Sequence, residues 1–205
     1  AHRLGIPHYV VNYEKEFKKG VVDYFASEYE KGRTPNPCVM CNSKLKFDHL
    51  IDRAAALGAE PIDEMAEEDW RYVVEVNLVG AMSAVHAALK RFDDGGQVVI
   101  VGSISAHIHA PGESVYSATK AGLQAFSETL RKEVAERKVR VGLIEPGTVG
   151  TDMQEADANE QRQKIAQHEM LYAEDVAEAV EFLLDRPARV DVVALRIEPR
   201  LQELP

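Results

Sequence analysis

Residues 115–120 read Val-Tyr-Ser-Ala-Thr-Lys and place Tyr116 and Lys120 four positions apart. Small and apolar residues then recur at helical spacing from Ala118 to Val134, which predicts a helix through this segment. Residues four apart are neighbours on a helix, so we expect the Lys120 ammonium beside the Tyr116 phenol. Because a nearby positive charge favours the phenolate, Lys120 is expected to lower the pKa of Tyr116 and to let the phenol exchange a proton near neutral pH.

Two predicted strands flank this helix. The apolar runs 97–102 and 139–144 both have the composition of buried parallel strands. Ser103 follows the first run directly, and a turn that contains Pro146 follows the second. Ligands bind at the carboxyl ends of the strands in open α/β sheets, so we expect Ser103 and this turn at one edge of the sheet.

Taken together, these features resemble the short-chain dehydrogenase/reductase family. The resemblance runs from about Pro61 to Leu204 and rests on Asn77, Ser103, Tyr116, Lys120, Pro146 and Gly147. It implies an α/β fold of the three-layer, Rossmann-like type with a mostly parallel sheet, in an incomplete or chimeric form. It also implies a homo-oligomer, because the helix that reaches about Arg91 and the Tyr116 helix form the subunit contacts in that family. The alternative is that these helices only pack on the sheet.

The resemblance implies an oxidoreductase that transfers a hydride between NAD(P)H and a small carbonyl or alcohol substrate. Tyr116 would be the general acid and base, and Lys120 would lower the Tyr116 pKa and hold the cofactor ribose. Ser103 would hydrogen-bond the substrate oxygen, and Asn77 would position a water for proton relay. The residues implied in cofactor binding are Tyr116, Lys120, Pro146, Gly147, Val149 and Thr151.

Two further features lie near this predicted site. His107 and His109 fall between Ser103 and Tyr116, where the family lines its substrate pocket, and we assign them no chemistry beyond a substrate contact. The polar segment 157–169 is helix-prone and corresponds either to the family's mobile substrate lid or to a solvated helix. An amphipathic helix is expected from Ala173 to Leu184.

Residues 1–59 differ in character from the rest of the chain. The loop 34–42 reads Thr-Pro-Asn-Pro-Cys-Val-Met-Cys-Asn and, with its surroundings, resembles the tRNA-specific 2-thiouridylase family. That resemblance implies Cys41 as a sulfur-handling residue, ATP as cofactor and tRNA as partner. The chemistry needs a second cysteine about a hundred residues on, and no cysteine follows Cys41 in this sequence. We therefore expect two parts, a thiouridylase-like α/β segment over 1–59 and a reductase-like catalytic part over 60–205.

The glycine-rich turn that holds the cofactor pyrophosphate in the reductase family has the pattern Thr-Gly-x-x-x-Gly-x-Gly. No such spacing occurs in the 205 residues. Backbone donors of that turn and of the following helix N-terminus normally bind the phosphates. We therefore expect NADP or NAD to bind weakly if at all, and the sequence leaves the choice between them open.

Composition limits the remaining classes. Hydrophobic residues make up 45% and charged residues 28% of the chain, as in ordinary soluble proteins. A net charge of −10 argues against a nucleic-acid surface, and no apolar run predicts a membrane span. Two cysteines suggest a reducing, cytoplasmic setting, and no cysteine–histidine spacing predicts a metal site. Three hypotheses remain: a reductase, a tRNA-thiolation fragment that uses ATP, and a non-catalytic chimeric α/β scaffold.

Overall fold

The structure is a computed structural model and describes residues 60–92, 95–151, 154 and 156–202. The chain divides into two compact units, Ala1–Ile51 and Asp52–Pro205, and every described residue belongs to the second. The predictions for residues 1–59, including Cys41 and its loop, lie outside the described residues. The domain boundary expected near residue 59 stays a prediction.

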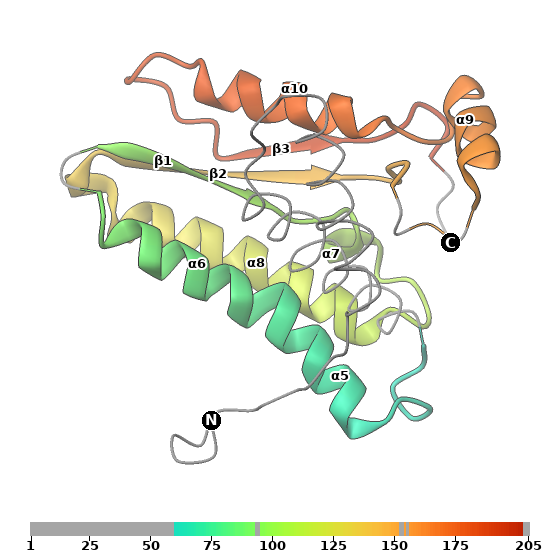
Figure 1. The fold of residues 1–205 in the computed structure, drawn as a ribbon. Coiled ribbons are helices and arrows are strands. Elements are labelled where there is room, and N and C mark those ends of the chain that lie inside the picture. Colours follow the sequence, from blue (N-terminus) through green and yellow to red (C-terminus); the bar gives the residue numbers. More distant parts are fainter. Residues whose placement is uncertain (1–59, 93–94, 152–153, 155, 203–205) are drawn as a thin grey trace, which may run out of the picture. The chain divides into compact units, whose positions relative to one another are not determined.

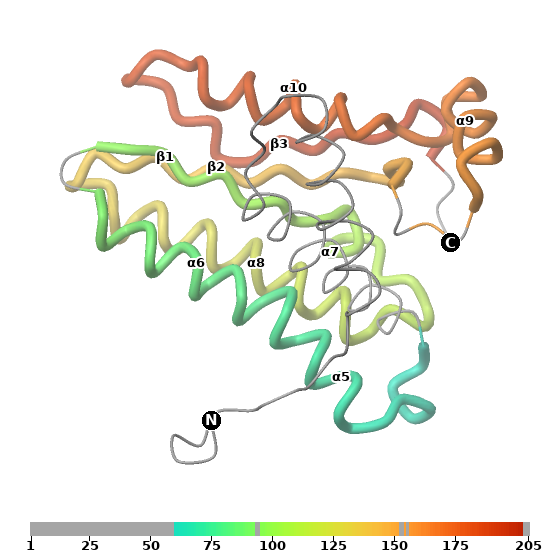
Figure 2. Tube along the Cα trace, viewed as in Figure 1, coloured from blue at the N-terminus to red at the C-terminus, as the bar shows by residue number. Residues whose placement is uncertain are grey.

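The described elements alternate between helices and strands (Figure 1). In chain order they are α5 (Glu67–Val74), the π-helical turn η4 (Glu75–Val79), α6 (Gly80–Leu89), β1 (Gly96–Val101), α7 (Ser105–Ile108), α8 (Ser114–Glu133), the 3-10 turn η5 (Ala135–Arg137), β2 (Val139–Pro146), α9 (Ala158–Ala166), α10 (Ala173–Leu184) and β3 (Ala194–Ile197). The strands form a parallel sheet in the order β1-β2-β3. Helices α6 and α8 cover one face and α10 covers the other (Figure 2), which confirms the predicted three-layer α/β class.

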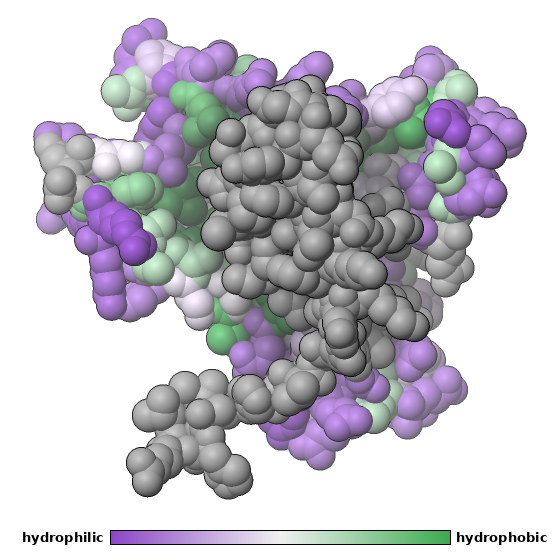
Figure 3. All heavy atoms as spheres, in the orientation of Figure 1, coloured by the Kyte–Doolittle hydropathy of each residue, from purple (hydrophilic) through white to green (hydrophobic). Residues whose placement is uncertain are grey.

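The core has two apolar layers, one on each face of the sheet. Ile100, Leu123 and Leu143 belong to the layer that joins the sheet to α6 and α8. Ile144 and Leu183 belong to the layer under α10. Since successive side chains of a strand point to opposite faces, the neighbours Leu143 and Ile144 enter different layers. Hydrophilic side chains prevail on the outer surface of α9 (Figure 3), whereas α10 also exposes Phe182 and Leu184.

Helix α8 is confirmed, but it buries a different face from the one the pattern predicts. Thr119 is among the most buried residues, and its hydroxyl donates to the Tyr116 carbonyl at 2.7 Å. Small residues instead face the neighbouring helix, since a Cβ on Gly122 would lie 3.1 Å from the Leu78 side chain of η4. The pattern missed this because α8 packs against both β2 and η4. The buried residues of α8 are Val115, Ser117, Thr119, Leu123, Ser127 and Leu130.

The predicted long helix before β1 is continuous from Glu67 to Leu89, with the π-helical turn η4 in its middle. By length and composition alone it could cross a membrane, with a mean hydropathy of 1.4 in its most apolar window. Core helices of soluble proteins, which are mostly buried, meet the same criterion, whereas 17% of this window is buried in the structure. Here Val85 packs in the layer with the sheet, and Val73 is fully buried beside Val115 of α8.

Candidate active site

Ser103 lies at the carboxyl edge of the sheet, two residues beyond the end of β1. Strand β2 continues two residues further than predicted, to Pro146. As a result, the residues on either side of Ser103 bond to β2: Gly102 N donates to the Ile144 carbonyl at 2.7 Å, and Ile104 N donates to the Pro146 carbonyl at 2.9 Å. The main chain at Ser103 is therefore fixed against the end of β2.

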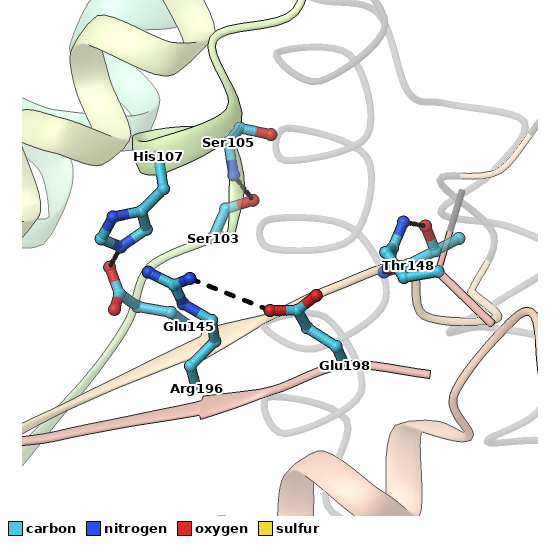
Figure 4. Close-up of polar contacts among 8 residues, drawn as sticks. Ser103, Ser105, His107, Glu145, Thr148, Arg196 and Glu198 are labelled. Carbon is cyan, nitrogen blue, oxygen red and sulfur yellow. Dashed lines mark hydrogen bonds and ion pairs between the residues drawn. The ribbon is translucent and has the colours of Figure 1, made fainter. Parts of the chain in front are cut away.

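Tyr116 approaches Ser103 from the first turn of α8, which begins at Ser114. The Ser103 hydroxyl lies near the Tyr116 phenol, where hydrogen bonding from Ser103 favours the phenolate and opposes the rise in the Tyr116 pKa. The Ser103 Oγ also accepts from the Ser105 main-chain N–H at 3.1 Å (Figure 4). The structure thus brings together two of the residues that the sequence places 13 positions apart.

Lys120 lies one helical turn after Tyr116, with its Nζ 5.2 Å from the centroid of the Tyr116 ring. Burial lowers the pKa of Lys120 to about 8. The same cause raises the pKa of Tyr116, an effect that the Ser103 hydrogen bond opposes and the Glu113 carboxylate reinforces. The expected lowering of the Tyr116 pKa is therefore wrong, because the cost of burying a phenolate outweighs the favourable contacts.

Asn77 lies in η4, where the helix widens by one residue per turn. Its Nδ2 donates to the Val73 carbonyl at 3.1 Å, one helical turn earlier. π-Helical turns within α-helices are frequent at functional sites. Within the described part of the chain no hydrogen bond joins Asn77 to Lys120, so a water relay between them stays a prediction.

The turn after β2 is held by the C-terminal segment. Gly147 N donates to the Ile197 carbonyl at 2.8 Å. Thr148 N donates to Gln202 Oε1 at 2.9 Å, and Gln202 Nε2 donates to Thr148 Oγ1 at the same distance. A Cβ on Gly147 would overlap Gln202 Oε1 and lie 2.9 Å from Pro199 Cδ, so a side chain at this position would displace Gln202.

The next residues of the turn bond to the segments around α9. Val149 forms a parallel bridge with Leu171, and Gly150 N donates to the Leu171 carbonyl at 2.9 Å. The Thr151 carbonyl accepts from the Gln161 side chain of α9 at 3.0 Å. The predicted cofactor-side residues therefore form one ordered turn, which begins at the same strand end as Ser103.

Two further residues lie at this edge: Glu145, to which the sequence interpretation gave no role, and His107, to which it gave only a substrate contact. Glu145, next to last in β2, is only 4% exposed. Its Oε1 lies 2.8 Å from His107 Nε2 of α7 (Figure 4). An acidic residue at the end of an apolar strand is a recognisable signal, because a buried carboxylate needs a polar partner. Across the described residues, no group of three or more His, Cys, Asp or Glu side chains could hold a metal ion.

Comparison with protein families identifies two similarities along the chain. A short chain dehydrogenase model matches residues 42–163. A tRNA methyl transferase HUP domain model matches residues 1–68, and the two matches overlap between 42 and 68. Both resemblances noted in the sequence are confirmed.

Solved structures similar to the chain are dehydrogenases. A dehydrogenase/reductase from Sinorhizobium meliloti 1021 is 30% identical with a TM-score of 0.60, over 71% of this chain and 60% of that one. A short chain dehydrogenase from Burkholderia cenocepacia J2315 in complex with NADP is 29% identical, with a TM-score of 0.59, over 69% and 60%. The chain therefore spans about three fifths of the length of these structures.

Curated relatives are similar to the first part of the chain. The tRNA-specific 2-thiouridylase MnmA of Clostridium acetobutylicum is 49% identical over 79 residues, which are 36% of this chain and 22% of that protein. The MnmA of Magnetococcus marinus is 60% identical over 60 residues, or 29% of this chain and 17% of that protein. The chain thus spans about a fifth of these relatives.

The two similarities differ in extent. The thiouridylase match is confined to the first third of the chain, outside almost all of the described residues. The dehydrogenase match includes Asn77, Ser103, Tyr116 and Lys120 and extends over more than half of the sequence. Because this family model matches more than half of the sequence, and the similar solved structures are Rossmann-type dehydrogenases, the chain belongs to the short-chain dehydrogenase family.

Proposed function

We propose that the chain is an NAD(P)-dependent oxidoreductase that transfers a hydride between the nicotinamide and a small carbonyl or alcohol substrate. The observation that supports this most is the convergence of Ser103, at the carboxyl edge of the sheet, and Tyr116, whose raised pKa the Ser103 hydroxyl acts to lower. The Lys120 ammonium beside the phenol ring completes the group. Its residues come from the end of β1 and one face of α8.

Each side chain has a role in carbonyl reduction. NAD(P)H, when bound, supplies the hydride, and negative charge then develops on the substrate oxygen. Tyr116 donates its proton to that oxygen, and the raised pKa keeps the phenol protonated at neutral pH. The Ser103 hydroxyl hydrogen-bonds the same oxygen, and the Lys120 ammonium offsets the charge of the phenolate that remains.

The described residues fit the ribose and nicotinamide of such a cofactor better than its phosphates. Tyr116, Lys120 and the turn after Pro146 offer hydroxyl, ammonium and main-chain groups for the ribose and nicotinamide. Three N–H groups of that turn, at Gly147, Thr148 and Gly150, already donate to protein oxygens. They are therefore not free to replace the phosphate-binding glycine turn, and we propose weak binding of NADP or NAD.

The test is NADPH oxidation, followed by absorbance, with a set of aldehydes and ketones. Tyr116→Phe keeps the ring and removes the exchangeable proton. We expect turnover with at least one carbonyl compound and a loss of about a hundredfold or more in kcat for the Phe chain. Equal rates in the two chains would refute the role of Tyr116.

A second candidate is a tRNA-thiolation fragment that uses ATP and Cys41. The observation that favours it is the match of residues 1–68 and its high identity to thiouridylases. Thermal unfolding with NADPH, with ATP and with buffer alone distinguishes the candidates, because a ligand that binds the folded chain raises its stability. A shift with ATP only would favour this candidate, and no shift with either nucleotide would favour a non-catalytic scaffold.

A further inference from the structure

We propose that His107 and Glu145 form a positioning pair that holds the Ser103 hydroxyl against the Tyr116 phenol. The inference rests on the proposed function, in which Ser103 and Tyr116 share the substrate oxygen. Neither His107 nor Glu145 is assigned a contact with substrate. Both act through the short helix α7, which joins Ser103 to the rest of the site.

Helix α7 follows Ser103 closely in the chain and bonds to its side chain. The helix has four residues, far fewer than an isolated helix needs to be stable, so tertiary contacts must hold it. Its Ser105 N–H donates to Ser103 Oγ at 3.1 Å. With that oxygen accepting from α7, the Ser103 hydroxyl is free to donate to the Tyr116 phenol. The Ser105 N–H of α7 thus occupies one acceptor site of the Ser103 oxygen and leaves the Ser103 proton available to the phenol.

Helix α7 packs mainly against α8, and hydrogen bonds to the end of β2 fix the chain that leads into it. The Ile144 and Pro146 carbonyls accept from Gly102 N and Ile104 N, on the two sides of Ser103. Glu145 lies between these two residues and extends to His107, near the far end of α7. Three consecutive residues of β2 therefore fix the main chain before and after Ser103 and also the end of the helix that follows it (Figure 4).

Loss of the His107–Glu145 contact would leave the Glu145 carboxylate without its hydrogen-bond partner. Glu145 is 4% exposed, and a buried carboxylate without a hydrogen-bond partner is strongly unfavourable. If His107 is replaced by an apolar residue, the carboxylate must turn toward solvent or another donor. Either movement removes one of the contacts that hold α7 beside the strand ends, and we expect the Ser103 side chain to shift relative to the Tyr116 phenol.

The test follows the titration of Tyr116 by NMR in chains that contain 13C-labelled tyrosine, with the Tyr116 signal assigned by its loss in Tyr116→Phe. Ser103→Ala removes the hydrogen bond that favours the phenolate, so it should raise the Tyr116 pKa further. His107→Leu should raise it at least half as much, and the double variant no more than Ser103→Ala alone. His107→Gln retains a donor near the Nε2 position and should restore the wild-type titration. His86→Leu, at an exposed position on α6, is the matched control and should change nothing.

Two results would overturn the proposal. One is a His107→Leu chain whose Tyr116 titrates as in the wild type, and the other is a double variant in which the two effects add in full. If the Leu chain does not fold, His107→Asn replaces it, since its shorter side chain cannot keep the 2.8 Å contact, and the same outcomes decide. The titration needs neither cofactor nor substrate. If the His107 and Ser103 variants affect the Tyr116 titration non-additively but the chain has no reductase activity, the proposed function is refuted and the positioning pair is supported.

Discussion

Lys120 provides a prediction that links the site to stability. Burial lowers its pKa from 10.5 to about 8 in the folded chain. Between these two values the unfolded chain binds more protons than the folded chain, so stability should rise with pH. Lys120→Met keeps an unbranched side chain that does not titrate, and it should abolish this rise.

The size of the effect follows from the two pKa values. Between about pH 7.5 and about pH 9.5, the gain in unfolding free energy due to Lys120 is about 2 kcal/mol, at about 1.36 kcal/mol per pKa unit. The folded state carries the cost of a buried ammonium below this range and loses it as the proton dissociates. The difference in stability between the wild type and Lys120→Met should therefore change by that amount.

Urea unfolding at several pH values measures the difference. Trp70 is the only tryptophan in the sequence and lies in α5, so its fluorescence reports on the part of the chain that contains Lys120. The matched control is Lys132→Met, on the same helix, because the Lys132 side chain is 64% exposed. A difference between the wild type and Lys120→Met that stays within about 0.5 kcal/mol across the range would refute the reasoning.

Three further outcomes are expected. Gly147→Ala should lower the unfolding free energy in urea by about 2–4 kcal/mol, because a Cβ displaces Gln202 and breaks its hydrogen bonds to Thr148. A loss below about 0.5 kcal/mol would show that the turn adapts freely. Calorimetry should give an NADPH dissociation constant no tighter than high micromolar. Without the glycine-rich turn, two charge-assisted hydrogen bonds to the phosphates are lost, each worth about 1.5–3 kcal/mol, which weakens binding by roughly two to four decades. Submicromolar binding would reveal another phosphate site. This chain should not transfer radiolabelled sulfur to tRNA with ATP, because no cysteine follows Cys41; labelled tRNA would contradict this.

The features that the sequence predicted depend mainly on local periodicity. Helix α8 follows from the spacing of its small and apolar residues, and β1 and β2 follow from apolar runs. The place of Ser103 at the sheet edge follows from the rule that parallel strands end together. These inferences need only the chain near each residue and the general geometry of α/β sheets.

The features that the sequence missed depend on residues far apart in the chain. The pKa of Tyr116 is set by burial, which periodicity does not give, so its predicted direction was wrong. His107 and Glu145 are 38 residues apart, and only the pairing of the segment before α7 with the end of β2 brings them into contact. The π-helical turn at Asn77 also has no signal in the apolar pattern, which continues through it.

The central claim is that Ser103 and Tyr116 act as one unit on one substrate oxygen. The most direct test is a double-mutant cycle on kcat/KM for NADPH-dependent carbonyl reduction, with Ser103→Ala, Tyr116→Phe and the double variant. Residues that act as a unit give strongly non-additive losses. The kcat/KM of the double variant should therefore lie within about threefold of that of Tyr116→Phe alone. Losses that multiply in full, or a wild-type chain that oxidises no NADPH with any carbonyl compound, would contradict the account.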